Sequence, residues 1–171
     1  MNKSLKGIEL INTVLNDFLK EFEVTAYFGT DFAYWYEKNE IEYSLIVPEE
    51  ASMYFMENFN KLAPHLECDP FLASFLHELG HACTLHLIDD SEECFCRDCK
   101  DRISKQLTDF ITEEEDRALH QQYFNLPDEY EATMWAINYM TNNSDKIASF
   151  WEKVQVAINR FYELNKLEVA V

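Results

Sequence analysis

Glycine and proline are rare in this chain, which contains three and four of them among 171 residues. Disordered and loop-rich chains are usually enriched in these two residue types. Aromatic residues are frequent by contrast, at 15% of the chain, and they supply apolar surface for a core. The composition therefore indicates a folded, mostly helical protein, and we expect residues 1–171 to form a single domain.

Long hydrophobic runs are absent as well. No stretch approaches the roughly 20 apolar residues that a membrane-spanning helix needs. The first residues lead into an amphipathic pattern and not into the apolar region of a signal peptide. The sequence thus predicts a cytoplasmic protein that does not associate with membranes.

Basic residues are outnumbered, with 14 Lys and Arg against 32 Asp and Glu, so that the formal net charge is −18. Nucleic-acid-binding proteins usually display a basic patch that neutralises phosphates. Here the basic residues are scattered along the chain, and we expect no nucleic-acid partner.

Cysteines number five, an odd count that favours free thiols or metal ligands over disulfides. Cys94, Cys96 and Cys99 form a C-x-C-x-x-C run in the polar segment 91–101, which we expect to be a loop. These thiols are either free or ligands of a second, structural zinc ion, which usually takes four Cys or His ligands. The fourth ligand would then come from one of three neighbours, namely Cys83, His86 and Asp98.

Hydrophobic periodicity divides the chain into helices and one group of strands. Helices are expected at residues 5–22, 53–62, 70–88, from 102 onward, 112–125, from 128 onward and, after 142–144, up to 164. Three β-branched and aromatic runs predict strands at residues 24–28, 32–36 and 40–47. The expected fold class is α+β, with a small antiparallel sheet near the N-terminus packed on a mostly helical core. Residues 41–47 would offer a sheet edge for an extended substrate.

The most informative motif is His77-Glu78-Leu79-Gly80-His81, an H-E-x-x-H run inside the helix that Asp69-Pro70 is expected to begin. On a helix, residues i and i+4 lie on one face, so His77 and His81 can bind one zinc ion. Glu78 lies beside this pair and can take a proton from a water molecule that the metal activates. The spacing therefore predicts a catalytic zinc site on a buried helix.

A catalytic zinc ion usually has three protein ligands and one water molecule. The acidic helix after Pro127 is the best source of the third ligand. Glu129 and Glu131 are two residues apart and diverge by about 200° on a helix, so only one of them can face the ion. We favour Glu131, because it precedes Ala132, whose small side chain would let this helix approach closely. Two histidines are rival third ligands, namely His86 and His120.

Three segments together resemble the ImmA/IrrE group of zinc peptidases, which is gluzincin-like. They are Ile46-Val47-Pro48, Phe75–His81 and Glu129–Ala136. In that group a strand precedes an H-E-L-G-H helix, and a later helix of the form E-x-E-A-x-x-F-A supplies a glutamate ligand. The resemblance implies a zincin-like fold, with Glu131 as the third zinc ligand. Members of the group are cytoplasmic, occur in mobile elements and stress responses, and cleave regulatory proteins.

The sequence thus predicts a zinc metallopeptidase that hydrolyses a peptide bond in a protein or peptide substrate, with Tyr130 and Tyr139 as candidates for stabilising the oxyanion. The alternative is a catalytically silent zincin-like binding protein, of phage or mobile-element origin, that sequesters a host protein. The intact Glu78 favours the enzyme, because a purely structural site has no need of a base.

Overall fold

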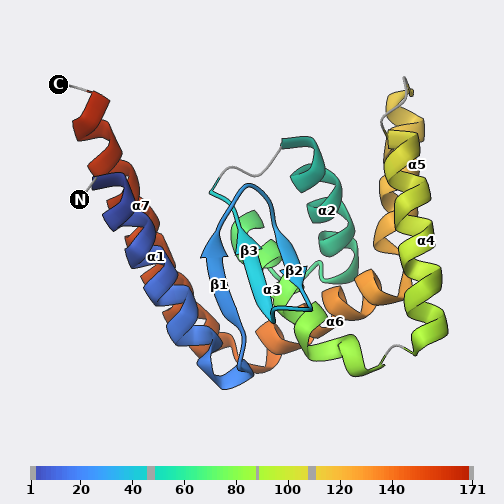
Figure 1. Cartoon of the computed structure of the whole chain (residues 1–171), viewed down its shortest axis with the longest axis horizontal. Coiled ribbons are helices and arrows are strands. Elements are labelled where there is room, and N and C mark those ends of the chain that lie inside the picture. Colours follow the sequence, from blue (N-terminus) through green and yellow to red (C-terminus); the bar gives the residue numbers. More distant parts are fainter. Residues whose placement is uncertain (1–2, 46–48, 88, 108–110, 170–171) are drawn as a thin grey trace. The chain divides into compact units, whose positions relative to one another are not determined.

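The computed structural model describes residues 3–45, 49–87, 89–107 and 111–169 (Figure 1). The chain forms two compact units, of which the first comprises residues 1–44 and 140–171 and the second comprises residues 45–139. The first unit contains a three-stranded sheet, whereas every element described in the second is helical. A mostly helical chain with a small sheet near its N-terminus agrees with the predicted α+β class.

Two long helices form the helical part of the first unit, α1 (Lys3–Leu19) and α7 (Ser144–Val169). They lie side by side and antiparallel (Figure 1), since Phe18 stacks on Phe150 with ring centroids 4.0 Å apart and Gly7 lies against Phe161. A short 3-10 turn, Lys20–Phe22, ends the first helix. The predicted helices at both ends of the chain are thereby confirmed, and their facing stripes are buried. The buried residues include Ile11, Leu15, Val154 and Ala157.

The sheet consists of β1 (Thr25–Phe28), β2 (Ala33–Trp35) and β3 (Glu40–Tyr43) in the order β1-β3-β2. β2 and β3 pair antiparallel, but β1 and β3 pair parallel. The predicted antiparallel sheet is therefore wrong for one of its two pairings. The predicted substrate edge is wrong as well, because β3 is the central strand and its backbone is already paired on both sides. Ile46 and Val47 lie outside the described residues.

A single carboxylate explains why β1 and β2 do not form a hairpin. Glu42 on β3 accepts hydrogen bonds from the backbone of Thr30 at 2.7 Å and from the side chains of Tyr27 and Trp35. The connection between β1 and β2 thus folds over β3 instead of turning back on β1. Gly29 is needed for this approach, because a Cβ atom there would lie 2.1 Å from a Glu42 oxygen.

The second unit is built from helices whose ends the sequence marks well. Asp69 caps one helix by accepting a hydrogen bond from the backbone of Phe71 at 2.8 Å. Thr112 and Glu115 form the predicted capping box of another helix. The helices are α2 (Glu49–Leu62), α3 (Pro70–Thr84), the 3-10 turn η2 (Leu85–Leu87), α4 (Asp90–Leu107), α5 (Glu113–Phe124) and α6 (Pro127–Asn142), which extends beyond the unit.

The segment 91–101, predicted to be a loop, lies within α4 and runs alongside α5 (Figure 1). Asp89 begins this helix by accepting hydrogen bonds from the backbones of Ser91 and Glu92 at 2.9 and 3.0 Å. Asp89 and Glu92 therefore mark a helix start that the cysteine pattern obscured. The prediction of a cysteine-containing loop is wrong.

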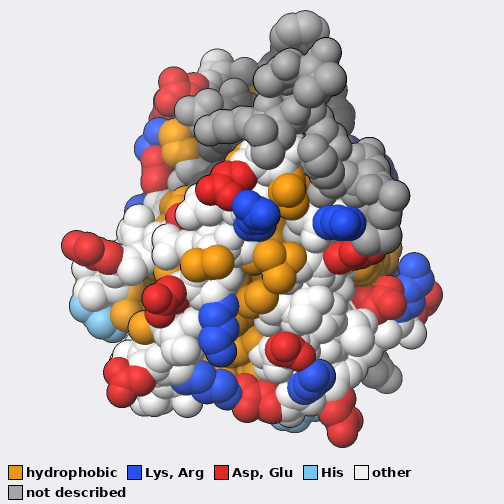
Figure 2. Space-filling view, turned by 90° about the vertical axis from the view of Figure 1, so that its left-hand side faces the viewer, with side chains coloured by type: hydrophobic (Ala, Val, Ile, Leu, Met, Phe, Trp, Pro, Cys, Tyr) orange, Lys and Arg blue, Asp and Glu red, His pale blue; other side chains and the backbone are white. Residues whose placement is uncertain are grey.

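Charged side chains of both signs cover the described part of the face shown in Figure 2. Acidic and basic groups alternate there around a narrow band of hydrophobic side chains, and neither sign forms a continuous patch on that part of the surface. Among the described residues, we find no helix with the length and apolar character that crossing a membrane requires.

Candidate metal centre

The H-E-x-x-H residues lie in the second half of α3, a helix that is buried over most of its length. The exposed fraction is 5% for His77 and 9% for Glu78, while His81 is partly exposed. Two imidazoles and a carboxylate are costly to bury unless ions or hydrogen bonds satisfy them. The site therefore depends on what the neighbouring helices supply.

Helix α6 crosses α3 at Gly80, where the two backbones come very close. A Cβ atom on Gly80 would lie 2.3 Å from the carbonyl oxygen of Ala132, and Ala132 itself is fully buried. This confirms the prediction that two small residues allow a close approach. Successive helix residues are about 100° apart. Around the helix, Glu129 and Thr133 therefore lie on the same, buried side of Ala132, and Glu131 lies on the other side.

Glu129, and not Glu131, is the carboxylate that the structure brings to the histidines. Its two oxygens lie 3.0 Å from Nε2 of His77 and 3.5 Å from Nε2 of His81. The two Nε2 atoms are 3.2 Å apart. Ligands at about 2.0–2.1 Å from a tetrahedral zinc ion are separated by roughly 3.3–3.4 Å, so the spacing of these three side chains fits such an ion.

Thr133 fixes the protonation of His77. The Thr133 hydroxyl donates its proton to the backbone carbonyl of Glu129 at 2.9 Å, and its oxygen lies 3.0 Å from Nδ1 of His77. Because that hydroxyl proton is already committed, Nδ1 of His77 must be the donor in the second contact. A neutral His77 then has a lone pair on Nε2, the atom that faces Glu129. This tautomer is the one that a metal ligand requires.

Glu129 is the most buried titratable side chain of the site, with an exposed fraction of 3%, and it contacts several other members of the site. Burial alone would raise the pKa of Glu129, but His81 and His77 hold this pKa well below its usual value. Lys100 on α4 forms an ion pair with the same carboxylate, with Nζ 2.5 Å from Oε1. Glu129 is therefore an anion in contact with three nitrogen-bearing side chains.

Tyr123 on α5 is a further member of the site, and no motif in the sequence marks this residue. Burial raises the pKa of Tyr123, and the negative charges of Glu129, Glu78 and Asp128 raise it further. The phenol thus stays neutral and hydrogen-bonds to Glu129 as a donor. Like Lys100, Tyr123 reaches the site from another helix, which no local spacing reveals.

The tyrosines and histidines considered from the sequence lie elsewhere. The exposed fraction of Tyr130 is 40%, and Tyr139 stacks on Trp135 with ring centroids 4.9 Å apart. His86 is exposed on η2. His120 lies on α5, 3.4 Å from Asp116. Among the described residues, neither His86 nor His120 belongs to the group of potential ligands that includes His77 and His81.

The C-x-C-x-x-C thiols do not converge. Cys96 and Cys99 are buried with Leu126, whereas Cys94 is exposed on another face of α4. On a helix, residues 94 and 96 diverge by about 200°, which separates their thiols. Within the part of the chain that the structure describes, none of these cysteines belongs to a group of three or more potential ligands within 4.8 Å of one another, whereas His77, Glu78 and His81 form such a group. The hypothesis of a second, structural zinc ion thus gains no support.

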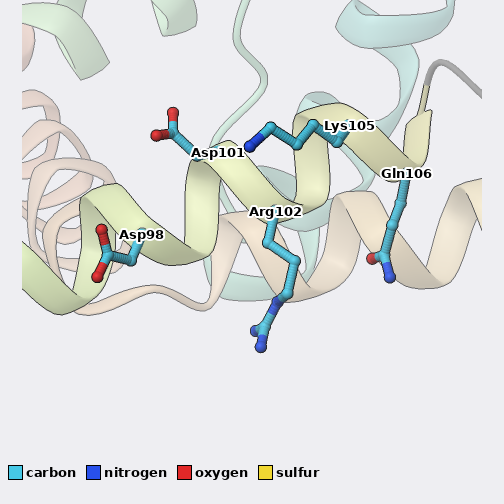
Figure 3. A pocket seen from close by; sticks show the side chains of 5 residues that line it. All are labelled: Asp98, Asp101, Arg102, Lys105 and Gln106. Atoms are coloured by element: carbon cyan, nitrogen blue, oxygen red, sulfur yellow. The ribbon is translucent and has the colours of Figure 1, made fainter.

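A pocket of about 370 Å³ lies away from these residues, along α4 (Figure 3). Its lining side chains all come from that one helix and carry charges of both signs. They are Asp98, Asp101, Arg102, Lys105 and Gln106. It contains none of His77, Glu78, His81 and Glu129, and of the residues considered for the second zinc ion it contains Asp98 alone, so we assign it no role.

Replacing Gly80 by Ala should destabilise the protein, although Ala is the better helix former by about 1 kcal/mol. The added methyl group would overlap backbone atoms of Ala132, and overpacking of a core costs about 1–3 kcal/mol or more. We expect a net loss of about 2 kcal/mol in the free energy of unfolding, measured by urea denaturation. Gly7→Ala, whose nearest contact is 2.9 Å, is the control with a smaller loss. A Gly80→Ala variant more stable than the natural protein would contradict the close approach of α3 and α6 at Gly80.

Comparison with known proteins adds no relative: no family model, no curated protein and no solved structure matches this chain.

Proposed function

We propose that this chain is a zinc-dependent peptidase of the ImmA/IrrE type, which hydrolyses a peptide bond in a protein or peptide substrate. One observation carries the proposal: the Nε2 atoms of His77 and His81 lie 3.2 Å apart, and each faces an oxygen of Glu129, at 3.0 and 3.5 Å. This spacing suits a tetrahedral zinc ion, to which two neutral imidazoles and the carboxylate would each present a lone pair.

Glu78 is the candidate general base of this centre. Its ligand atom lies within 4.8 Å of those of His77 and His81. A bound zinc ion would supply Lewis-acid activation of a water molecule. Glu78 then accepts the proton of that water and returns it to the leaving amine. Tyr123, a neutral donor close to Glu78 and Glu129, is our candidate for hydrogen-bonding the oxyanion, to which its proton would turn from Glu129.

The test combines elemental analysis with a hydrolysis assay on a mixture of fluorescence-quenched peptides of random sequence. We expect one zinc ion per chain, and we expect hydrolysis that stops when a chelator removes the metal. His77→Ala and His81→Ala should each lose the zinc ion, because each removes one ligand. A purified protein without bound metal, or peptide cleavage unaffected by the chelator, would contradict the proposal.

One contact favours a second candidate, the catalytically silent binding protein. The Lys100 ammonium already pairs with Glu129, so part of the charge in the site is compensated without any metal. A protein that binds zinc but cleaves none of the peptides would favour this candidate over the peptidase.

A further inference from the structure

Lys100 lies where a soluble protein rarely buries a lysine. Its Nζ is 2.5 Å from Oε1 of Glu129 and 2.5 Å from Oδ2 of Asp128, and its side chain is 26% exposed. Burial alone lowers the pKa of Lys100, but Glu129 and Asp128 raise this pKa above its usual value. The side chain is therefore an ammonium ion held between two consecutive carboxylates of α6.

The fold holds α4 firmly in this position. Cys96, one turn before Lys100, is buried and hydrogen-bonded to Asp128, and Cys99 packs with Leu126. The Lys100 ammonium also lies 5.4 Å from the ring centroid of Tyr123 on α5, within the range of a cation–π contact. The pairing thus involves three helices and is not a contact between mobile surface chains.

The two oxygens of Glu129 have different surroundings. Oε2 faces Nε2 of His77 at 3.0 Å, whereas Oε1 faces both Nε2 of His81 at 3.5 Å and the Lys100 ammonium at 2.5 Å. A metal ion held by the two histidines and Glu129 would thus share its carboxylate ligand with an ammonium ion. Two cations on one carboxylate repel each other, and burial strengthens that repulsion.

Charge balance supports the same relation. Glu78, Asp128 and Glu129 bring three negative charges close together, and Lys100 compensates one of them. With both imidazoles neutral, as metal ligands are, two negative charges remain, which a divalent cation would balance. Asp128 offers the ammonium a second acceptor at the same distance as Glu129, so Lys100 can keep one ion pair when a metal takes the other carboxylate.

We propose that Lys100 is a built-in counter-ion of the metal centre, a positioning residue that holds Glu129 in the metal-free protein and competes with the metal for it. On metal binding, the ammonium keeps Asp128 and gives up its contact with Oε1. This inference depends on the metal site proposed above. Lys100 and the metal then oppose each other's binding to Glu129. We expect Lys100 to change the metal affinity by a factor in the range of about 5–150, which is typical of two interacting ligands.

The experiment measures zinc affinity by competition with a chelating dye, and thermal unfolding with and without zinc. Lys100→Met keeps most of the length of the side chain and removes its charge. We expect this variant to bind zinc at least about fivefold more tightly than the natural protein. Its metal-free form should melt at a lower temperature, so that zinc raises its melting temperature further. Lys105→Met, an exposed position on the same helix, is the matched control and should change neither quantity.

Asp128→Asn tests the competition between Lys100 and the metal by changing the second acceptor of the ammonium. This variant also provides the test if Lys100→Met does not fold. With its second acceptor weakened, the ammonium should hold Glu129 more strongly and zinc should bind more weakly. In the Lys100→Met background, the Asp128→Asn substitution should have no further effect on zinc affinity, because the competing charge is gone.

The outcomes separate the two proposals. A natural protein that binds no zinc ends both the metal site and this inference. A natural protein that binds zinc, with Lys100→Met binding it equally or more weakly, leaves the metal site standing and overturns the antagonism. If Asp128→Asn folds but Lys100→Met does not, then unchanged or tighter zinc binding by Asp128→Asn overturns the antagonism.

Discussion

Replacing Glu78 by Gln should leave the zinc content of the protein unchanged and lower peptide hydrolysis by about 10²–10⁴-fold, the usual contribution of a general base. The amide has nearly the shape of the carboxylate but cannot accept a proton from water. Because Glu78 is not among the three side chains that we assign to the metal, its loss should not release the ion. The rate is measured on the fluorescence-quenched peptide mixture and the zinc content by elemental analysis.

Two further measurements exclude a merely structural role for Glu78. Glu78→Asp keeps the carboxylate but draws it back by one methylene, so we expect hydrolysis between that of the natural protein and that of Glu78→Gln. The melting temperatures of the two variants should be similar. Hydrolysis by Glu78→Gln at the natural rate would rule out Glu78 as the base.

Local signals were sufficient for the helix starts and for the H-E-x-x-H pair. Asp69 followed by Pro70 predicts a helix start whose geometry is contained in a few residues, and Thr112 with Glu115 does the same. The spacing of His77 and His81 needs only the helical repeat to put them on one face. Each of these features lies within one or two turns of chain, which is why the sequence reveals it.

The sheet pairing depended on contacts that no local pattern shows. Gly29 with Thr30 and Asp31 reads as a hairpin, but Glu42, twelve residues beyond Thr30, binds this turn and draws β3 between β1 and β2. The glycine is present because Glu42 passes close to it, and not because a tight turn needs it. A residue type that signals a turn can thus equally signal a close approach.

Lys100 and Tyr123 were missed for a related reason. Each comes from a helix other than α3 or α6, and neither stands in a spacing that a metal motif defines. The cysteines of α4 drew attention as ligands, whereas buried Cys96 and Cys99 pack the helix that carries Lys100. In that segment Lys100 is the residue that reaches Glu129, and Cys96 and Cys99 pack in the core.

Sequence reasoning favoured Glu131 as the third ligand, whereas the structure brings Glu129 to the histidines. The argument from Ala132 was sound about the close approach of the helices, since Gly80 and Ala132 do meet. It failed on the direction of the side chain. Glu131, one residue before Ala132, is about 100° from Ala132 around the helix, whereas Glu129, three residues before Ala132, is only about 60° from it. Thr133 occupies the same buried side and binds His77.

Glu129→Gln and Glu131→Gln form a matched pair that decides this assignment. Glu129→Gln should weaken zinc binding by more than about 100-fold, beyond the 10–100-fold that loss of an outer partner costs. It should also lower the metal-free free energy of unfolding by about 1–3 kcal/mol, because Lys100 loses an ionic partner. Glu131→Gln should leave zinc affinity unchanged and stability within about 0.5 kcal/mol. Competition with a chelating dye and urea denaturation measure the two quantities. The reverse pattern, with Glu131→Gln losing the metal, would mean that α6 must turn on its axis when zinc binds.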